Sequence, residues 1–414
     1  MVIGSFLVIG GGLVGSAAAL RLRDAGFAVT LIDPGDPRRG ASFGNAGHLA
    51  TEQVEPLASW RTLAGAPARL SAFGGPLDFR LRDLPFWAPW AAGFLAASRP
   101  SVVRCGTAAL SALLGDAIAA WQRLAELAEA PSLIQPLGHV VVWMSARAAE
   151  RGRAAWARTP IGSAGIRELD GPALEHIGSA LRRPPAAGIR FTGTGQVSDP
   201  QAMRDALLAR FAALGGRIVA AGVRTIRVEP GRVAVVLDRG GDLDADAALV
   251  AAGAWSGPLM RQLGARVPLV AERGYSIQST SHEWPDDLPP VVFEERSMVV
   301  SRFSSGLRAT SFLEIGRPDA PADAGKWRRL QQHLAALGIA FAALPDRWCG
   351  PRPTLPDYLP AIGRLGDQAR ILYAFGHQHL GLTLAAVTAE LVQALATRSK
   401  PAIDLRPFRI ERFG

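Results

Sequence analysis

The chain has 414 residues, of which 49% are hydrophobic and 20% charged, and this composition is typical of a folded globular protein rather than a disordered one. The net charge of +9 comes from 45 basic and 36 acidic residues. Most basic residues stand singly among apolar ones, which argues against a nucleic-acid-binding protein and indicates an ordinary solvated surface, with an anionic cofactor or substrate as the alternative. Cys105 and Cys349 are far apart, which argues against a disulfide framework or structural zinc site.

The N-terminal segment is apolar but has no preceding basic region and is interrupted by glycines, so we expect no signal peptide. No run of 18 or more apolar residues is apparent, and we expect no transmembrane helix. Together with the two isolated cysteines, this predicts a cytoplasmic location, with peripheral contact at the inner face of the cell membrane left open.

Residues 5–33 predict a strand, a helix and a second strand. The first strand leads into the sequence G-x-G-x-x-G, formed by Gly10, Gly12 and Gly15 with Leu13 and Val14 inside it. Helix-forming residues follow, Gly26 predicts the end of the helix, and Asp33 follows the second strand.

These residue types suit a dinucleotide. The first glycine permits a tight turn, the second lets the backbone approach a pyrophosphate, and the third lets the helix pack on the strand. The phosphates would meet free N–H groups at the helix N-terminus, and Asp33 would accept hydrogen bonds from a ribose. We therefore expect a dinucleotide-binding site here.

The stretch after Asp33 distinguishes FAD from NAD. It is rich in small residues, among them Ser42, Asn45, Ala46 and Gly47, which allow a cofactor to lie close along the backbone. This "S-x-x-N-A-G" segment and the preceding unit resemble the flavin-binding start of the D-amino-acid oxidase superfamily. The resemblance extends over nearly the whole chain and implies FAD as the cofactor. It also makes His48, which follows directly, one candidate for a proton acceptor near the flavin.

The next 150 residues predict the elements of a second domain. Helical segments are expected at 83–98 and 105–128, and a strand at 138–145. A further strand is expected at 272–280, where Tyr275 either lines the substrate pocket or packs in the core. The resemblance implies an antiparallel sheet covering the flavin, with helices behind it.

Residues 195–265 return to the first domain. Asp199 and Pro200 predict the start of a helix. The resemblance implies that the strand near Val223 passes the adenine. It also implies that the strand ending at 248–257 faces the flavin, with Ala252 and Gly253 leaving room for it beside Trp255.

The segment 350–363, "GPRPTLPDYLPAIG", resembles the superfamily's G-x-R-P motif, which implies that Arg352 binds the substrate carboxylate. A planar guanidinium makes two parallel charge-assisted hydrogen bonds to a carboxylate. The alternative is an arginine exposed between prolines.

The segment 373–395 predicts a strand end, a glycine loop and a helix that begins near residues 381–383. His377 and His379 could suggest a metal site, but the other histidines supply no second ligand pair, and we expect no metal. The loop instead resembles the superfamily's G-H-x-x-x-G motif, which lies under the flavin. The positive helix end would favour the reduced flavin, and His379 would contact the substrate. The implied cofactor-contacting residues are Gly376, His377, Gly381, Leu382 and Thr383.

The order of these motifs predicts an α/β fold with an α+β second domain. A discontinuous Rossmann-type FAD-binding domain is expected at 1–60, 195–265 and 350–414. The substrate-binding domain is expected at 61–194 and 266–349.

The resemblance implies oxidation of a C–N bond beside a carboxylate by hydride transfer to flavin N5, with Arg352, His379, His48 and Tyr275 as catalytic-site candidates. The sequence is most similar to bacterial D-amino-acid dehydrogenases of the D-hydroxyproline type, which would pass electrons to a quinone or a partner electron-transfer subunit. Two alternatives are an oxygen-using amine oxidase of the glycine, sarcosine or opine type and, from another class, a flavin-dependent tRNA-modifying protein.

Overall fold

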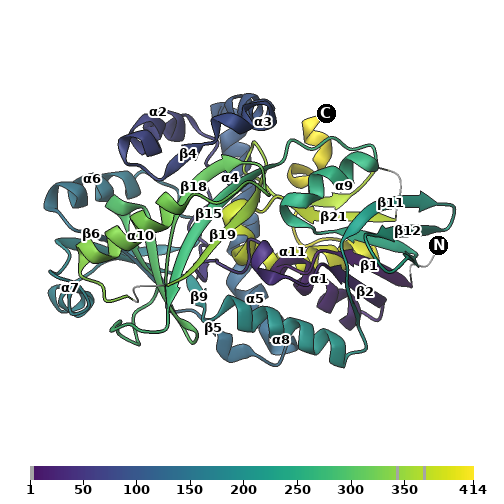
Figure 1. Ribbon diagram of the computed structural model, residues 1–414, viewed down its shortest axis with the longest axis horizontal. Helices are drawn as coiled ribbons and strands as arrows, with labels where there is room; N and C mark the ends of the chain where they lie inside the picture. The colour runs from purple at the N-terminus through teal and green to yellow at the C-terminus, as the bar shows by residue number, and fades with distance from the viewer. Residues whose placement is uncertain (1–3, 342–344, 367–369) are drawn as a thin grey trace.

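The computed structural model describes residues 4–341, 345–366 and 370–414. Two main sheets dominate the structure, and Figure 1 shows the sheet containing β1, β2 and β21 in one half of the molecule and the sheet containing β15, β18 and β19 in the other. The chain passes between these halves several times, so each half is assembled from segments that are distant in sequence.

The first sheet has the strand order β10-β2-β1-β14-β21-β20. Five of its strands are parallel, and only the edge strand β20 runs antiparallel. The strands are β1 (Ser5–Ile9), β2 (Ala28–Asp33), β10 (Arg217–Ala220), β14 (Ala247–Val250), β20 (Ala361–Arg364) and β21 (Ile371–Phe375). Because the central strands are covered on both faces, they consist of nearly continuous apolar residues.

Each face of this sheet has its own cover. Phe6 and Val8 point toward four helices, α1 (Leu13–Asp24), α5 (Ala117–Leu127), α8 (Pro200–Ala213) and α11 (Gly381–Thr397). Leu7 and Ile9 point to the other face, which is covered by helix α9 (Ser256–Gln262) and by a three-stranded antiparallel sheet of β11 (Val223–Glu229), β12 (Arg232–Leu237) and β13 (Asp242–Ala245). The sandwich arrangement fixes β1 and its following glycine loop in the centre of the domain.

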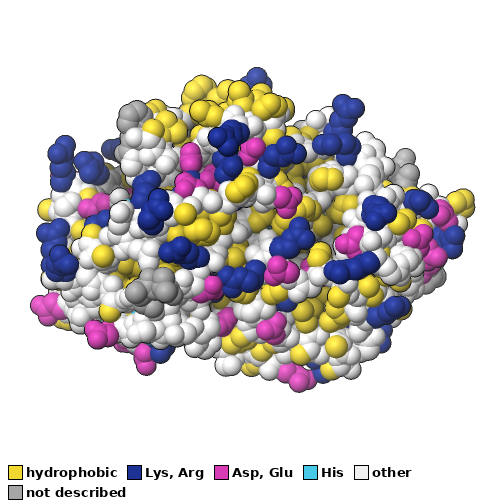
Figure 2. Space-filling model, viewed as in Figure 1, with side chains coloured by type: hydrophobic (Ala, Val, Ile, Leu, Met, Phe, Trp, Pro, Cys, Tyr) yellow, Lys and Arg dark blue, Asp and Glu magenta, His cyan; other side chains and the backbone are white. Residues whose placement is uncertain are grey.

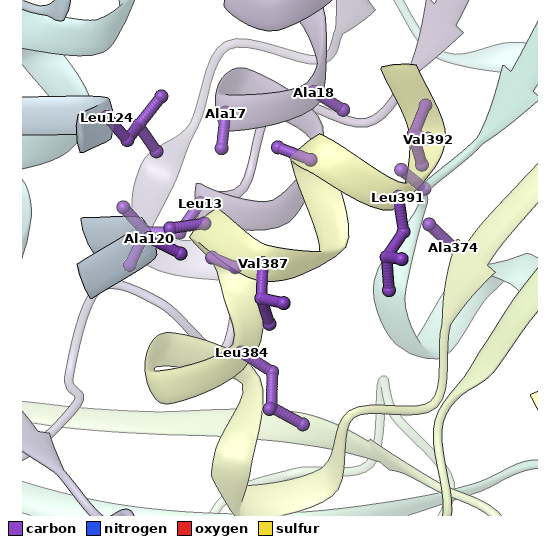
Figure 3. Packing of buried hydrophobic residues seen from close by; sticks show 14 of the residues in the cluster. Leu13, Ala17, Ala18, Ala120, Leu124, Ala374, Leu384, Val387, Leu391 and Val392 are labelled. Atoms are coloured by element: carbon purple, nitrogen blue, oxygen red, sulfur yellow. The ribbon is translucent and has the colours of Figure 1, made fainter. Parts of the chain in front are cut away.

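Helices α1 and α11, from opposite ends of the chain, pack directly against each other (Figure 3). On α1 the contact surface consists of small side chains, and Ala17 and Ala18 are fully buried. On α11, Ala385, Ala386 and Ala389 are also fully buried, whereas the larger Val387 and Leu391 point away from α1 (Figure 3). Small side chains on both helices allow their backbones to approach closely without cavities.

The second main sheet has nine strands, eight of them in the order β19-β15-β18-β17-β16-β6-β8-β7, with β4 pairing on β18. Most neighbouring strands are antiparallel, as expected, but the pairs β6–β16 and β4–β18 are parallel, which makes the sheet a mixed one. The strands are β4 (Leu77–Phe79), β6 (His139–Trp143), β7 (Gly165–Glu168), β8 (Ala187–Thr192), β15 (Val270–Ser279), β16 (Val291–Phe293), β17 (Met298–Phe303), β18 (Gly306–Gly316) and β19 (Asp346–Thr354).

Of the remaining helices, α10 covers one face of this sheet, whereas α4 packs with α5 and α11 in the core of the first sheet. The helical segment expected at 105–128 is two helices, because α4 ends and α5 begins at Asp116. A small sheet of β3 (His48–Leu49), β9 (Gly195–Val197) and β5 (Ile134–Gln135) connects segments from both halves. The helices are α2 (Trp60–Arg69), α3 (Leu84–Ala97), α4 (Pro100–Gly115), α6 (Ala146–Trp156), α7 (Gly171–Gly178) and α10 (Ala324–Leu337).

Two helical stretches in the described parts of the chain are long and apolar enough to cross a membrane, Pro100–Leu127 and Gln378–Thr397. The first is interrupted at Asp116. The second contains α11, and 67% of its apolar window is buried inside the structure. Length and hydropathy alone are therefore weak evidence for a membrane span in either stretch, and the expected lack of a transmembrane helix stays a prediction.

We predict that Ala17→Leu destabilises the protein by about 1–3 kcal/mol, because the added side chain has no space between α1 and α11. The free energy of unfolding, measured by chemical denaturation, tests this. The matched control is Ala212→Leu, the same change at an exposed position of α8, for which we expect an effect within about 0.5 kcal/mol. Equal effects of the two substitutions would contradict the packing argument.

Candidate active site

A cavity of about 660 Å³ lies at the carboxyl ends of β1, β2, β14 and β21 and extends to β19 of the second sheet. In open α/β sheets, ligands bind in this position. The cavity brings together the predicted residues Gly10, Gly12, Leu13, Val14, Gly15, Asp33, Ser42, Asn45, Val223, Ala252, Gly253, Trp255, Arg352, His377, Gly381 and Leu382.

The three glycines of the first loop are needed for different structural reasons. A Cβ added at Gly10 would lie 2.4 Å from the Ala251 carbonyl oxygen, and one added at Gly15 would lie 1.9 Å from the Gly10 carbonyl oxygen. Both positions therefore need glycine for the fold itself. A Cβ at Gly12 would meet only the Ser42 hydroxyl, at 3.4 Å, so its missing side chain leaves free space on the cavity side.

The N-terminus of α1 opens into the same space. Its N-cap residue, Gly12, provides no side-chain hydrogen bond, while the Leu13 N–H donates to the Ser42 hydroxyl at 3.2 Å. Arg204 from α8 also lines the cavity, and its Nε donates to the Gly11 carbonyl at 2.6 Å. A helix N-terminus with a neighbouring guanidinium favours a bound pyrophosphate. Sequence patterns gave no signal for Arg204, since only the packing of α8 on α1 brings it here.

Asp33 is oriented by two backbone groups. Its Oδ2 accepts from the Gly11 N–H at 2.7 Å and its Oδ1 from the Gly35 N–H at 2.9 Å. The carboxylate keeps further lone pairs on the cavity side, where a ribose diol can donate to it. The open space at Gly12, the uncapped helix and this carboxylate fit an adenine dinucleotide, so the residues present can hold FAD.

The loop at 41–47 is held in place by the second sheet. Buried Arg308 on β18 donates through Nη1 to the carbonyl oxygens of Phe43 and Asn45, at 3.0 and 2.7 Å, and Ser301 on β17 donates to that of Ala46 at 2.6 Å. Burial lowers the pKa of Arg308 to about 10. The Asn45 side chain accepts from the Gly47 N–H and shapes the turn. Sequence analysis missed both sheet residues, because their role depends on contacts more than 250 positions away.

Arg352 lies on β19 at the end of the cavity, among its lining residues, and its binding of a substrate carboxylate stays a prediction. A Cβ on the neighbouring Gly274 would lie 2.2 Å from Arg352 Nη2, so this glycine makes room for the guanidinium. Arg352 Nη1 is 3.3 Å from Oε1 of the buried Glu272, whose other oxygen accepts from Tyr358 at 3.2 Å. Burial raises the pKa of Glu272, and the nearby Arg352 opposes this effect.

The loop before α11 is fixed by buried hydrogen bonds. His377 Nε2 is 3.0 Å from the Thr388 hydroxyl, and Gln378, which has a positive φ, donates to the Tyr358 carbonyl at 2.7 Å. Burial lowers the pKa of His377 to about 3. Helix α11 begins at Gly381 without a side-chain N-cap, and its first residues line the cavity as expected. Gly376 and Thr383 do not line it, but the Thr383 hydroxyl accepts from the Ala50 N–H and so ties the helix to the first domain's loop.

His379 lies behind this loop and does not line the cavity. Its Nε2 is 2.6 Å from the Gln53 amide oxygen, and burial lowers its pKa to about 3. His377 and His379 thus have separate partners. In the described parts of the chain, neither belongs to a group of three ligand atoms close enough to hold a metal ion.

His48 belongs to a buried cluster with Glu52 and His139, and none of the three lines the cavity. The His48 and His139 rings lie 4.0 Å apart. Oε2 of Glu52 is 3.8 Å from His48 Nε2, and its Oε1 is 3.9 Å from His139 Nε2. Burial raises the pKa of Glu52 to about 7 and lowers that of His48 to about 4. Sequence analysis missed Glu52 and His139.

Tyr275 is on the wrong face of its strand for the predicted role. Arg352 and its cross-strand partner Glu272 face the cavity side of the sheet, whereas Tyr275, three residues further along β15, faces the core beneath α10 by the normal alternation of side chains. Its hydroxyl lies 3.2 Å from the Glu314 carboxylate, which also binds Lys326. The expectation that Tyr275 lines the pocket is therefore wrong, and the alternative of core packing is confirmed.

Comparison with known proteins agrees with this arrangement. Residues 5–395 match the DAO family model, described as FAD dependent oxidoreductase. The chain is 34% identical to a D-amino-acid oxidase of Bradyrhizobium diazoefficiens, over 98% of each chain. It is 31% identical to D-amino acid dehydrogenase 2 of Pseudomonas aeruginosa, over 96% of each. The protein therefore belongs to the DAO family of FAD-dependent oxidoreductases, and FAD is its cofactor.

Solved structures share the fold at low sequence identity. Glycine oxidase from Geobacillus kaustophilus aligns with a TM-score of 0.71 and 21% identity, covering 98% of this chain and 97% of that one. L-Proline dehydrogenase from P. horikoshii aligns with a TM-score of 0.70 and 14% identity, covering 100% and 99%. These likenesses confirm the predicted two-part architecture with a Rossmann-type FAD-binding sheet.

We predict opposite consequences for two glycine substitutions in the first loop. Gly12→Ala should leave the stability of the apoprotein nearly unchanged but weaken FAD binding by about tenfold or more, because the added Cβ occupies only cofactor space. Gly15→Ala should destabilise the apoprotein by about 1–3 kcal/mol, because its Cβ would overlap the Gly10 carbonyl. Thermal denaturation of the apoproteins and fluorescence titration with FAD measure the two effects. A destabilised Gly12→Ala apoprotein would contradict the assignment.

Proposed function

We propose that the protein oxidises the C–N bond beside the carboxylate of a D-amino acid or cyclic imino acid, of the D-proline or D-hydroxyproline type. The observation that carries this proposal is the position of Arg352, a guanidinium at the end of the cavity whose other walls fit FAD. FAD, when bound, supplies the acceptor for the two electrons that such an oxidation releases.

Arg352 is suited to hold a carboxylate. Its contact with Glu272 uses one nitrogen, Nη1, at the long distance of 3.3 Å, and Gly274 lets the guanidinium lie flat against β15. The planar group can then present paired N–H donors toward the cavity. Holding the substrate by its carboxylate in this way positions its Cα, and the arginine does not have to act as an acid or a base.

The surroundings of Arg352 favour a substrate with a neutral side chain. It is flanked by Pro351 and Pro353, and Glu272 is the carboxylate with which it forms an ion pair in the described structure. Burial and, to a smaller extent, the nearby Arg352 lower the pKa of His379 to about 3, so this side chain is neutral at neutral pH. Proline-type substrates, which are apolar or carry one hydroxyl, meet this condition.

The relatives' names support the stereochemistry that we propose, but they include both an oxidase and a dehydrogenase and so leave the electron acceptor open. The relative from Bradyrhizobium is named a D-amino-acid oxidase, and that from Pseudomonas a D-amino acid dehydrogenase. We favour a dehydrogenase that passes electrons to a quinone or a partner electron-transfer subunit. An oxygen-using oxidase of the glycine, sarcosine or opine type is the first alternative. The tRNA-modifying alternative would need a clustered basic face, whereas Figure 2 shows Lys and Arg side chains dispersed over the face in view.

Anaerobic stopped-flow reduction of the bound flavin tests the proposal. We expect D-proline and hydroxy-D-proline to reduce it faster than L-proline, glycine or sarcosine. A quinone analogue should then reoxidise it faster than oxygen does. If none of these amino acids reduces the flavin, the proposed reaction is wrong, and fast reoxidation by oxygen would favour the oxidase.

The same assay examines Arg352. We expect Arg352→Gln to weaken substrate binding, seen as a loss of about 30-fold to 1,000-fold in kcat/KM carried mainly by KM, because the carboxylate loses its charged partner. Arg352→Lys should lose less, since it keeps the charge but not the planar donor pair. The matched control is Arg347→Gln, an exposed arginine on the same strand, which should have wild-type kinetics.

We predict that buried Glu52 makes the stability of the protein depend on pH. Its raised carboxyl pKa means that the folded protein loses stability as pH rises from about 4.5 to about 7, and Glu52→Gln should lack this loss. Chemical denaturation across this pH range measures the effect, and an equal loss in Glu52→Gln would contradict it.

A further inference from the structure

Helix α3 presents an unusual outer face. From Leu84 to Ala97 the helix contains no charged residue, and its exposed positions are all apolar. Exposed fractions are 46% for Leu84, 37% for Phe86 and 54% for Leu95. The exposed residues of the helix are Leu84, Pro85, Phe86, Pro89, Ala92, Leu95 and Ala96.

The apolar surface continues beyond both ends of the helix. Leu81, just before it, is 79% exposed, and Val102, in the first turn of α4, is 41% exposed. Figure 2 shows a cluster of apolar side chains at the edge of the molecule where Figure 1 places α3. We call the surface formed by Leu81, Leu84, Phe86, Leu95 and Val102 the α3 patch. Contiguous exposed patches of this kind mark interaction sites.

Basic residues flank the α3 patch. Arg82 precedes the helix, and Arg99 and Arg104 follow it, all three exposed. The described residues provide none of them with an ion-pair partner, and the only acid beside them at the helix start, Asp83, is within 3.3 Å of Arg80. An apolar helix face with unpaired arginines at both ends is complementary to a lipid surface that carries negative headgroups.

The inner face of α3 is firmly attached to the rest of the protein. Trp90 is 4% exposed, and its ring and that of Phe94 lie 6.3 and 5.9 Å from the ring of Tyr358. A Cβ on Gly93 would be 3.0 Å from Pro356. The outer face is therefore a rigid surface on a helix that is already docked, and its aromatic and apolar side chains are held outward. Since Tyr358 also binds Glu272, this helix backs the wall behind Arg352.

We infer that the α3 patch docks the protein onto the surface of an anionic lipid bilayer, with α3 lying in the plane of the interface. The helix has 14 residues, so it would cover about 21 Å of that plane, too short to cross the bilayer but sufficient to bury its apolar side chains among the headgroups. Arg82, Arg99 and Arg104 then contact the lipid phosphates. This inference does not depend on the identity of the substrate or the electron acceptor.

Co-sedimentation of the FAD-loaded full-length protein with vesicles tests the inference. We expect binding to vesicles of phosphatidylcholine mixed with phosphatidylglycerol, weaker binding to phosphatidylcholine alone, and weakening by added salt. The double variant Leu84→Glu/Leu95→Glu should lower the partition coefficient by roughly tenfold or more. Arg99→Gln and Arg104→Gln should each lower binding to the anionic vesicles by about fivefold.

The matched control is Leu137→Glu, because Leu137 is 52% exposed but lies in the loop before β6, away from the α3 patch. It should bind vesicles like the wild type. Leu84→Glu/Leu95→Glu should keep wild-type thermal stability and flavin reduction with a soluble dye as acceptor. These readouts separate loss of docking from misfolding and from failure of the proposed reaction.

Three results would overturn the inference. One is the lack of binding to either kind of vesicle. A second is binding that Leu84→Glu/Leu95→Glu and Leu137→Glu reduce equally, which would place the contact elsewhere. The third is a dimer in light scattering that the double variant separates while vesicles do not bind, which would make a second copy of the chain the occupant of the α3 patch.

Discussion

The contact between α1 and α11 is the constraint on which the remaining structure depends. The two helices come from opposite ends of the chain and both pack on the same face of the parallel sheet. Their close approach requires small side chains: Ala17 and Ala18 of α1 are fully buried, and α11 also carries fully buried alanines, Ala386 and Ala389. Because both helices start at the carboxyl edge of the sheet, this packing brings their N-termini to one cavity, at Gly12 and Gly381. Two positive helix ends thus face the same dinucleotide site.

Residues of the second main sheet complete this site. Arg308 and Ser301 bind backbone carbonyls of the 43–46 loop, so the loop's position depends on strands of the other domain. Burying a guanidinium is costly unless its donors are satisfied, and Arg308 meets this requirement with carbonyl oxygens and the Gln278 amide. The same sheet supplies Arg352. The same sheet therefore positions both the 43–46 loop and Arg352.

Burial favours the neutral form of several ionisable side chains near the site. His377, His379 and His48 have lowered pKa values and Glu52 a raised one, each with desolvation as the largest cause. Arg352 is the charged residue of β19 that a substrate carboxylate would meet in the cavity. Neutral neighbours strengthen this contact, because they neither compete for the guanidinium nor screen its charge. The site therefore combines a charged group for the substrate carboxylate with residues that hold the cofactor, rather than a set of catalytic acids and bases.

The sequence alone determined the features that depend on neighbouring residues. The glycines at 10, 12 and 15, Asp33 after β2 and the loop before α11 each follow from local backbone geometry, and so the FAD-binding unit and Arg352 were predictable from short motifs. Tertiary structure alone decided which face each distant side chain uses. Tyr275 faces α10 and Glu272 faces the cavity side, and Arg204, Arg308, Glu52 and His139 joined their partners only through packing. Alternation along a strand divides its side chains between two faces, but the layers packed on the sheet decide which face meets the cavity, and no local pattern carries that information.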